Sequence, residues 1–365
     1  MSLKRSLKRQ EPRNRGVQLV PADSQLRILM ITSEWPTPAS PNDVPFIVQQ
    51  VKFLRRLGVY VDVFHFRGSG NPVQYLRAWC GARARLSRRR YDLVHAQWGQ
   101  SALLALPKKI PLVTTFRGSD LEGVVSETGR YTVSGRILKI ISKLMARASD
   151  QVIVVSESLA SHLPNLHCHV VPSGVDLTLF RPIPQEEARR RLGLPMEKLL
   201  VCFAASPNRA VKRYSLAREA VTLLAPRFDV DLIVTSGVPR SLMPYYFSAC
   251  DALLLTSSHE GSPNVLKEAL ACDLPVVSVD VGDARQRLSS VDGCFVCADA
   301  RPETLAKSLS QVLEARRRIQ GVAAVRDLSE GELASRVLAV YRSAARLTHP
   351  GAVCRVEGTR PGKVG

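Results

Sequence analysis

Short apolar runs that are typical of buried β-strands alternate along this chain with segments of helical periodicity. Because parallel strands need a crossover connection, usually a helix, this alternation predicts parallel sheets covered by helices. The predicted strands are 26–32, 60–66, 92–96, 112–116, 151–155 and 169–171 in the first half, and 199–204, 231–235, 252–256, 275–279 and 293–296 in the second. We therefore expect an α/β protein with doubly wound sheets.

A chain of 365 residues is long enough for two α/β domains of roughly 150–180 residues each. The proline-rich, non-periodic stretch Phe180-Arg181-Pro182-Ile183-Pro184 is the predicted linker. The expected organisation is a basic disordered arm (1–23), two Rossmann-like domains (24–180 and 181–331), a helix (332–347) and a tail (348–365).

The net charge of +19 favours anionic partners such as nucleic acid, anionic lipid or phosphorylated substrates. Two basic clusters lie in the first half: Arg83, Arg85, Arg88, Arg89 and Arg90, and then Arg136, Lys139, Lys143 and Arg147. The second cluster follows a helical period, and the apolar residues between its members are expected to face the core: Ile137, Ile140, Ile141, Leu144 and Met145. This stripe is then either the solvated face of a core helix or a surface attracted to an anionic cytoplasmic leaflet.

Several classes of protein are disfavoured. No apolar run approaches the ~20 residues that cross a bilayer, and the basic N-terminus has no hydrophobic segment that would make it a secretory signal. The loop after the first strand, Ser33-Glu34-Trp35-Pro36-Thr37-Pro38, lacks the glycines of a dinucleotide-binding fingerprint, and the chain has no P-loop. The scattered cysteines form no metal-binding pattern, which favours a reducing cytoplasm.

Residues 257–271 read S-S-H-E-G-S-P-N-V-L-K-E-A-L-A and lie between two predicted strands. The loop turns at Gly261-Ser262-Pro263 and enters a helix at about Asn264, whose free backbone N–H groups suit a phosphate. Glu260 and Glu268 flank this anion site. A carboxylate beside a phosphate is favourable where it binds sugar or ribose hydroxyls, whereas the plain alternative is an ordinary strand–loop–helix with solvated carboxylates.

This segment resembles the E-x7-E signature of family 4 glycosyltransferases, and the similarity extends from about Gln25 to Leu347. The resemblance implies a GT-B fold, in which an N-terminal acceptor domain and a C-terminal nucleotide-sugar donor domain face each other across a cleft. It also implies that the helix 332–347 returns to the N-terminal domain.

In the donor domain, the resemblance assigns a diphosphate-binding lysine to Lys212. Arg209 is the expected arginine partner, with Arg213 as the alternative. Glu268 should accept hydrogen bonds from ribose, and Glu260 from hydroxyls of the transferred sugar. Ser262 is expected to bind the donor, the backbone of Asn264 and Val265 should meet the diphosphate, and the main chain at Val238 should contact the base.

In the N-terminal half, residues 113–120 read V-T-T-F-R-G-S-D and resemble the family segment T-x-H-G-x-D. Arg117 stands where the family has histidine, and its guanidinium cannot act as an acid or base near neutral pH but can stabilise a departing phosphate. His95 matches another family histidine near the cleft, or is a packed, hydrogen-bonded residue at a strand end. Glu260, Arg117 and His95 are the predicted catalytic residues.

The expected activity is retaining transfer of a sugar from a nucleotide diphosphate-sugar to a hydroxyl acceptor, in cell-surface or extracellular polysaccharide or glycolipid assembly. Neither a cofactor nor a metal is expected, since the lone Asp229-Val230-Asp231 enters a strand at the end away from the cleft. The expected partners are the donor, an acceptor for which a lipid-linked sugar is a candidate, and an anionic membrane surface touched from the cytoplasm. The alternatives are an epimerase-like enzyme on nucleotide sugars and a basic nucleic-acid-binding protein, the latter disfavoured by few aromatic residues.

Overall fold

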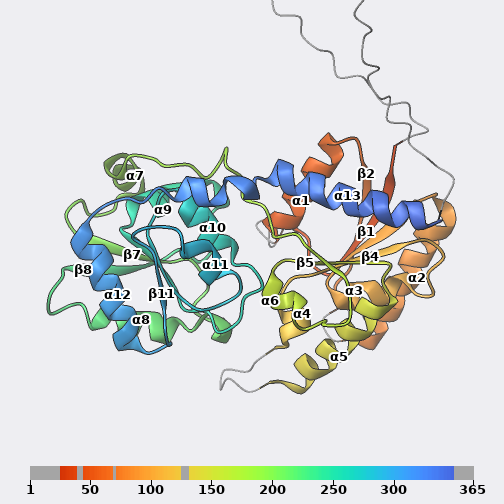
Figure 1. The fold of residues 1–365 in the computed structure, drawn as a ribbon, viewed down its shortest axis with the longest axis horizontal. Helices are drawn as coiled ribbons and strands as arrows, with labels where there is room; N and C mark the ends of the chain where they lie inside the picture. The colour runs from red at the N-terminus through yellow and green to blue at the C-terminus, as the bar shows by residue number, and fades with distance from the viewer. Residues whose placement is uncertain (1–24, 39–43, 69–70, 125–130, 349–365) are drawn as a thin grey trace, which may run out of the picture.

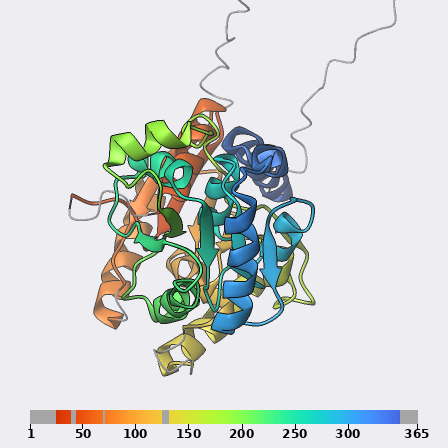
Figure 2. The same ribbon diagram turned by 90° about the vertical axis from the view of Figure 1, so that its left-hand side faces the viewer.

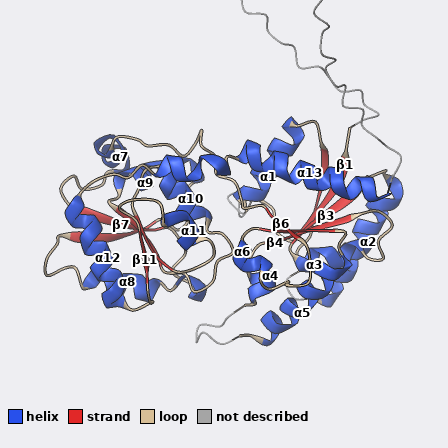
Figure 3. Ribbon diagram, in the orientation of Figure 1, coloured by secondary structure: helices blue, strands red, loops and turns tan. Residues whose placement is uncertain are grey.

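The computed structural model describes residues 25–38, 44–68, 71–124 and 131–348. The predicted arm 1–23 lies outside the described residues, as does the predicted tail beyond Thr348. Two parallel sheets are present, one in each half of the chain, so the predicted GT-B architecture is confirmed (Figure 3). Every predicted strand is found within two residues of its expected bounds.

The N-terminal sheet has the strand order β2-β1-β3-β4-β5-β6, with every neighbouring pair parallel. Its strands are β1 (Arg27–Thr32), β2 (Tyr60–His65), β3 (Leu93–Gln97), β4 (Leu112–Phe116), β5 (Gln151–Val154) and β6 (Cys168–Val170). Its helices are α1 (Pro45–Arg56), α2 (Pro72–Arg88), α3 (Gly99–Ala102), η2 (Leu103–Ala105), α4 (Ser119–Glu122), α5 (Val133–Ala148) and α6 (Glu157–Ala160). The central strands β3 and β4 are buried throughout, because helices cover both faces of the sheet.

The C-terminal sheet has the order β11-β10-β9-β7-β8, again parallel. Its strands are β7 (Leu199–Phe203), β8 (Val230–Val234), β9 (Ala252–Leu255), β10 (Val276–Val279) and β11 (Phe295–Cys297). Its helices are α7 (Gln185–Leu192), η3 (Ala210–Lys212), α8 (Tyr214–Thr222), η4 (Arg240–Leu242), α9 (Met243–Ala249), α10 (Asn264–Ala271), α11 (Ala284–Leu288), α12 (Pro302–Ala315) and η5 (Gly321–Leu328). The proline-rich stretch 180–184 contains no helix or strand and connects the two sheets.

The last helix, α13 (Glu330–Thr348), leaves the C-terminal domain and packs on the N-terminal domain against α1 (Figures 1 and 2). Its Tyr341 hydroxyl hydrogen-bonds the Nδ1 atom of buried His95 at 2.6 Å, and Arg336 donates to the carbonyl of Val170 at 2.6 Å. The chain therefore crosses between the domains twice, which ties them together.

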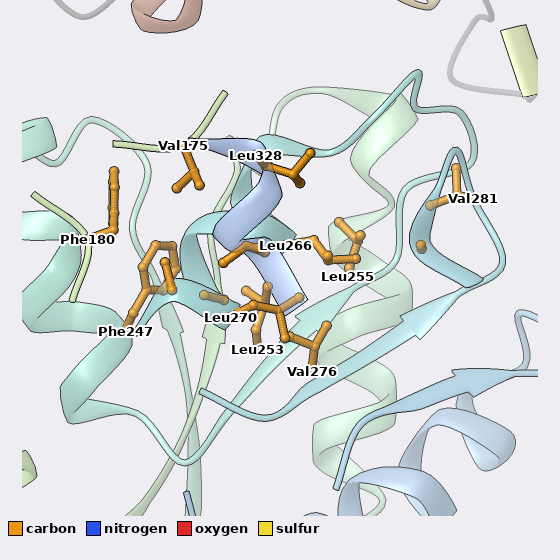
Figure 4. Close-up of a cluster of buried hydrophobic side chains, with 14 of the residues drawn as sticks. Val175, Phe180, Phe247, Leu253, Leu255, Leu266, Leu270, Val276, Val281 and Leu328 are labelled. Carbon is orange, nitrogen blue, oxygen red and sulfur yellow. The ribbon is translucent and has the colours of Figure 1, made fainter. Parts of the chain in front are cut away.

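Helix α10 is anchored in the core of the C-terminal domain. Leu266 and Leu270 are fully buried and point into a cluster with Phe247, Leu253 and Val276 (Figure 4). Burying a leucine side chain contributes about 1.5–3 kcal/mol. These contacts fix the direction of α10, and with it the position of its first turn.

The predicted core-facing side of α5 is wrong for three of its five apolar residues, whereas Met145 is buried and Ile141 is partly buried as expected. Ile137, Ile140 and Leu144 are exposed rather than buried, and the face that α5 turns inward carries Gly135, Ser142, Met145 and Ala146. The helices pack closely: a Cβ on Gly99 of α3 would lie 2.7 Å from the Cα of Ser142, so larger side chains do not fit between them. Hydrophobic periodicity locates the helix but not its buried face, because small residues make the closest helix contacts here. Among the described helices, none has the length and apolar character needed to cross a membrane.

Candidate active site

A cavity of about 690 Å³ lies between the two domains, where loops follow the carboxyl ends of strands from both sheets. This is the position at which open α/β sheets bind ligands. The structure brings seven of the ten predicted site residues to its walls: Arg117, Arg209, Lys212, Glu260, Ser262, Asn264 and Val265. The other three, His95, Val238 and Glu268, do not line it.

The first turn of α10 forms one wall of the cavity. Its N-cap residue, Pro263, offers no side-chain acceptor, and the first turn contains no acidic residue. The backbone N–H groups of Asn264 and Val265 therefore lack the usual capping partner, and the helix dipole adds partial positive charge there. In the described part of the chain, the buried Oδ1 atom of Asn264 also has no hydrogen-bond partner. The free N–H groups suit an anion, whereas the Asn264 oxygen, which only accepts hydrogen bonds, suits a hydroxyl donor.

Two cations of the segment after β7 reach the same wall. Lys212 forms an ion pair with Glu260, and both side chains are mostly buried. Arg209 lines the cavity, and none of its side-chain contacts to the described residues is a hydrogen bond or an ion pair. Arg213, in contrast, donates to the carbonyls of Thr256 and Ser257 and so supports the loop after β9. Of the two predicted arginine candidates, Arg209 is the one that faces the cavity.

Glu268 lies in the second turn of α10, below the cavity wall. It is buried, and its Oε1 atom accepts a hydrogen bond from Arg240 at 2.7 Å. Burial raises the pKa of Glu268, while the charge of Arg240 opposes this effect. Arg240 also lies over the ring of Phe180 at 4.9 Å. Val238 precedes η4 in the loop that carries Arg240, and sequence reasoning gave Arg240 no role.

Arg117 is held from several sides at the floor of the cavity. Its Nε atom donates to Gln97 at 3.0 Å, and NH1 donates to Ser173 at 2.8 Å. Its guanidinium stacks on Phe46 at 4.7 Å. Burial lowers the pKa of Arg117 to about 10, so the side chain stays charged at neutral pH. A fixed, partly desolvated cation of this kind stabilises negative charge more strongly than one in water.

His95 occupies a different position from the predicted catalytic one. It is completely buried, with Nε2 bonded to the Thr115 hydroxyl at 2.7 Å and Nδ1 bonded to Tyr341 of α13. Burial, with a smaller effect of the Arg117 charge, lowers the pKa of His95 to about 3. Both ring nitrogens are used and the ring does not reach the cavity, so the packed, hydrogen-bonded alternative describes His95.

The hydroxyl of Ser262 belongs to a buried network rather than pointing freely into the cavity. It donates to Asp283 at 2.8 Å and accepts from Lys267 at 3.0 Å. Lys267 also donates to the carbonyl of Ser173 in the N-terminal domain at 2.8 Å, and burial lowers its pKa to about 8. Lys267 thus joins the two domains at the floor of the cleft. Sequence reasoning gave it no role, because a lysine in a helix is usually exposed.

Glu122 is a cavity residue that the sequence did not indicate. Its Oε2 atom is buried and, among the residues that the structure describes, has no hydrogen-bond partner. Burial, and then the negative charges of Glu260 and Asp120, raise the pKa of Glu122 to about 7. Glu122 and Glu260 thus face the cavity from opposite domains. Because they are far apart in the sequence, the sequence did not indicate that these two carboxylates share one cavity.

The Asp229-Val230-Asp231 motif lies at the start of β8, and both carboxylates pair with Lys198 at 3.3 and 2.9 Å. Within the described ranges, no group of three or more His, Cys, Asp or Glu side chains is arranged to hold a metal ion.

The fold and the cleft define a GT-B glycosyltransferase. Sequence profiles support this class: residues 24–179 match the family described as Glycosyltransferase Family 4, and residues 200–315 match Glycosyl transferases group 1. The chain belongs to the family 4 glycosyltransferases.

Similar proteins include the Bacillus subtilis protein provisionally named teichuronic acid biosynthesis glycosyltransferase TuaC, which is 28% identical over 70% of this chain and 82% of its own length. A D-inositol 3-phosphate glycosyltransferase of Thermobispora bispora is 24% identical over 80% of both chains. Among solved structures, sucrose-phosphate synthase of Thermosynechococcus elongatus has a TM-score of 0.70 at 17% identity, covering 87% of this chain and 99% of its own. Anabaena HepE in complex with UDP-glucose has a TM-score of 0.60 at 17% identity, covering 89% and 100%. These structures share the fold.

Proposed function

We propose that this glycosyltransferase moves a sugar from a nucleotide diphosphate-sugar to a hydroxyl acceptor with retention of configuration and without a metal ion. The observation that carries the proposal is the single wall formed by the uncapped start of α10, Lys212 and Arg209, with Glu260 beside it. The likeness to HepE, whose structures contain UDP and UDP-glucose, adds support for this donor class.

In this proposal, the donor diphosphate binds at the N–H groups of Asn264 and Val265, with Lys212 and Arg209 on either side. These fixed positive groups do the work that a divalent cation does elsewhere, because they neutralise charge as it builds on the leaving diphosphate. Donor binding exchanges partners: Lys212 turns to phosphate oxygens, and Glu260 accepts hydrogen bonds from the sugar hydroxyls. The ion pair between them keeps both charged groups in place before the donor arrives.

The nucleoside extends from the diphosphate toward Glu268 and Val238. Glu268 accepts hydrogen bonds from ribose, and Arg240 orients its carboxylate by holding Oε1. The main chain around Val238 contacts the base, and Ser262 keeps the loop before α10 in position through Lys267 and Asp283.

The transfer step breaks the bond between the anomeric carbon and the diphosphate oxygen, and the bonding electrons leave with the diphosphate. The acceptor oxygen attacks on the same face, and its proton passes to a phosphate oxygen. Arg117 stabilises the departing negative charge from the N-terminal side. Glu260 orients the sugar, and His95 holds α13 rather than touching the substrate.

Glu122 is our candidate for contact with the acceptor, since its free, buried oxygen faces the cavity from the N-terminal domain. The ionised carboxylate would accept a hydrogen bond from the incoming hydroxyl. The names of the relatives place their reactions in teichuronic acid assembly and on inositol phosphate, and we propose a cell-surface glycan or glycolipid acceptor for this chain, glycosylated at the cytoplasmic side.

The direct test is release of nucleoside diphosphate from a panel of nucleotide sugars in the presence of EDTA. We expect activity with a matching donor, and loss of at least about 100-fold in Lys212→Ala, as for other single groups that stabilise developing charge. Asp231→Ala is the matched control: it removes the far-end motif and should leave the rate unchanged. An absolute requirement for a divalent metal, or loss of activity in Asp231→Ala, would refute the metal-free mechanism. Inversion at the anomeric carbon of the product would refute retention.

A further inference from the structure

Helix α5 exposes a row of large apolar side chains that no described segment covers. The exposed fractions are 75% for Val133, 52% for Ile137, 61% for Ile140 and 52% for Leu144. Spacings of three and four place these residues along one side of the helix. Single exposed apolar residues need no explanation, but a contiguous row on one helix marks an interaction site.

The same helix is strongly basic and contains no acidic residue. Arg136, Lys139, Lys143 and Arg147 alternate with the exposed apolar residues along the helix. Beyond its C-terminal end, Lys108 donates to the carbonyl of Ala148 at 2.9 Å and pairs with Asp150 at 2.7 Å, so the exposed Lys109 of the 107–110 loop continues the basic surface. That loop, in turn, lines a second cavity of about 790 Å³ together with the basic cluster in the last turns of α2 and just after it, including Arg83, Arg88 and Arg90. We call the exposed side of α5, from Val133 to Arg147, the α5 surface.

We propose that the α5 surface docks on a bilayer that contains anionic lipids. A helix that exposes apolar side chains between lysines and arginines lies in the membrane interface, where the apolar groups enter the acyl boundary and the cations meet lipid phosphates. The uniform positive charge favours an anionic membrane over a protein partner. The α5 surface offers only positive charge, it continues into a larger basic region, and the chain as a whole carries +19. Figures 1 and 2 place α5 at the outer edge of the molecule.

The α5 surface also adjoins the active-site cavity. The N–H of Thr132, the N-cap of α5, donates to the carbonyl of Val124, a cavity residue, at 2.9 Å. The ring of Tyr131 meets the ring of His259, another cavity residue, at 6.3 Å. A docked α5 therefore places the cavity beside the bilayer, where an acceptor with a lipid anchor can enter. This last point rests on the proposed function, whereas docking itself does not.

The experiment is flotation of the full-length protein with vesicles of phosphatidylcholine alone or mixed with equal phosphatidylglycerol. We expect binding only to the anionic vesicles. Each basic residue near an anionic surface contributes about 1 kcal/mol, so Arg136→Gln with Lys143→Gln should weaken binding roughly 30-fold. The matched control, Arg218→Gln with Lys307→Gln, removes the same charge from exposed positions on α8 and α12 of the other domain. It should change binding by no more than about twofold, because screening limits distant charges.

A second pair of substitutions tests the contribution of the apolar residues of the α5 surface. Ile140→Ser with Leu144→Ser should weaken binding at least about tenfold and abolish the fraction that survives high salt, since each loses buried apolar area. Met196→Ser with Leu223→Ser, two exposed apolar residues of the C-terminal domain, is the control. Equal weakening by both charge pairs, no binding to anionic vesicles, or unchanged binding in the Ile140/Leu144 pair would overturn the proposal. Nucleotide release with a soluble acceptor is measured in parallel and should be unaffected, so failure of docking and failure of the proposed activity remain distinguishable.

Discussion

Glu330, the first residue of α13, carries a carboxylate that the fold buries without a partner. It is 6% exposed, and among the described residues neither oxygen has a hydrogen-bond partner. Burial and then the charge of Asp176 raise the pKa of Glu330 from 4.5 to about 7, while Arg240 and Lys52 oppose the shift and Glu268 adds to it. We therefore expect Glu330→Gln to stabilise the protein above neutral pH.

The direction of this pH dependence follows from how many protons the folded and unfolded states bind. Between about pH 4.5 and 7 the folded state binds more protons at this site than the unfolded state, so the free energy of unfolding falls as the pH rises through that range. A pKa raised from 4.5 to about 7 corresponds to an upper limit of about 3 kcal/mol. Because water penetration and local relaxation lower the cost of burying a charge, we expect the pH-dependent part of the free energy of unfolding to be about 1–3 kcal/mol. Glutamine does not titrate, so Glu330→Gln should remove this dependence.

The assay is the thermal unfolding midpoint of wild type and Glu330→Gln at pH 5 and pH 8. The gain in Tm should be several degrees larger at pH 8 than at pH 5, given roughly 2–4 °C for each kcal/mol in a unit of about 150–250 residues, the size of one domain. Glu332→Gln is the matched control, since Glu332 is an exposed carboxylate in the same turn of α13 and has the same relation to the helix dipole. An equal gain at both pH values, or the same gain in Glu332→Gln, would refute the reasoning.

Three further predictions concern the cleft. Gly261→Ala should lower kcat/KM at least about tenfold and also lower Tm. The new Cβ would lie 2.1 Å from the carbonyl oxygen of Arg117 and force the domains apart. Unchanged kinetics would show that this close contact is dispensable. For wild type we expect kcat/KM to rise through about pH 7, and Glu122→Gln should remove this rise. Donor binding, measured by thermal shift, should stay intact in this variant. Loss of donor binding would place Glu122 on the donor side instead. Arg117→Lys should lower kcat more than it raises KM for donor, since a lysine cannot keep both the Gln97 and Ser173 contacts; a pure KM effect would remove Arg117 from the transition-state role.

The sequence by itself determined the two sheets and one wall of the active site. Strand-like runs that are separated by helix-forming segments allow few topologies. Each predicted strand appears in a parallel sheet. The cations after β7 and the 257–271 segment follow strand ends of one sheet. Parallel strands bring such loops to the same edge, so Lys212 and Glu260 could be expected to meet, and they form an ion pair.

Tertiary structure decided what each side chain faces. His95 is buried because Tyr341 arrives from 246 positions away on a helix that crosses from the other domain. Burial in the folded protein raises the pKa of Glu122, and the negative charge of Glu260 from the other domain raises it further. Ile137, Ile140 and Leu144 of α5 are exposed because the neighbouring elements pack against the side of the helix that carries Gly135, Ser142, Met145 and Ala146. Each outcome depends on contacts between residues distant in sequence, and local periodicity and motif spacing contain no information about such contacts.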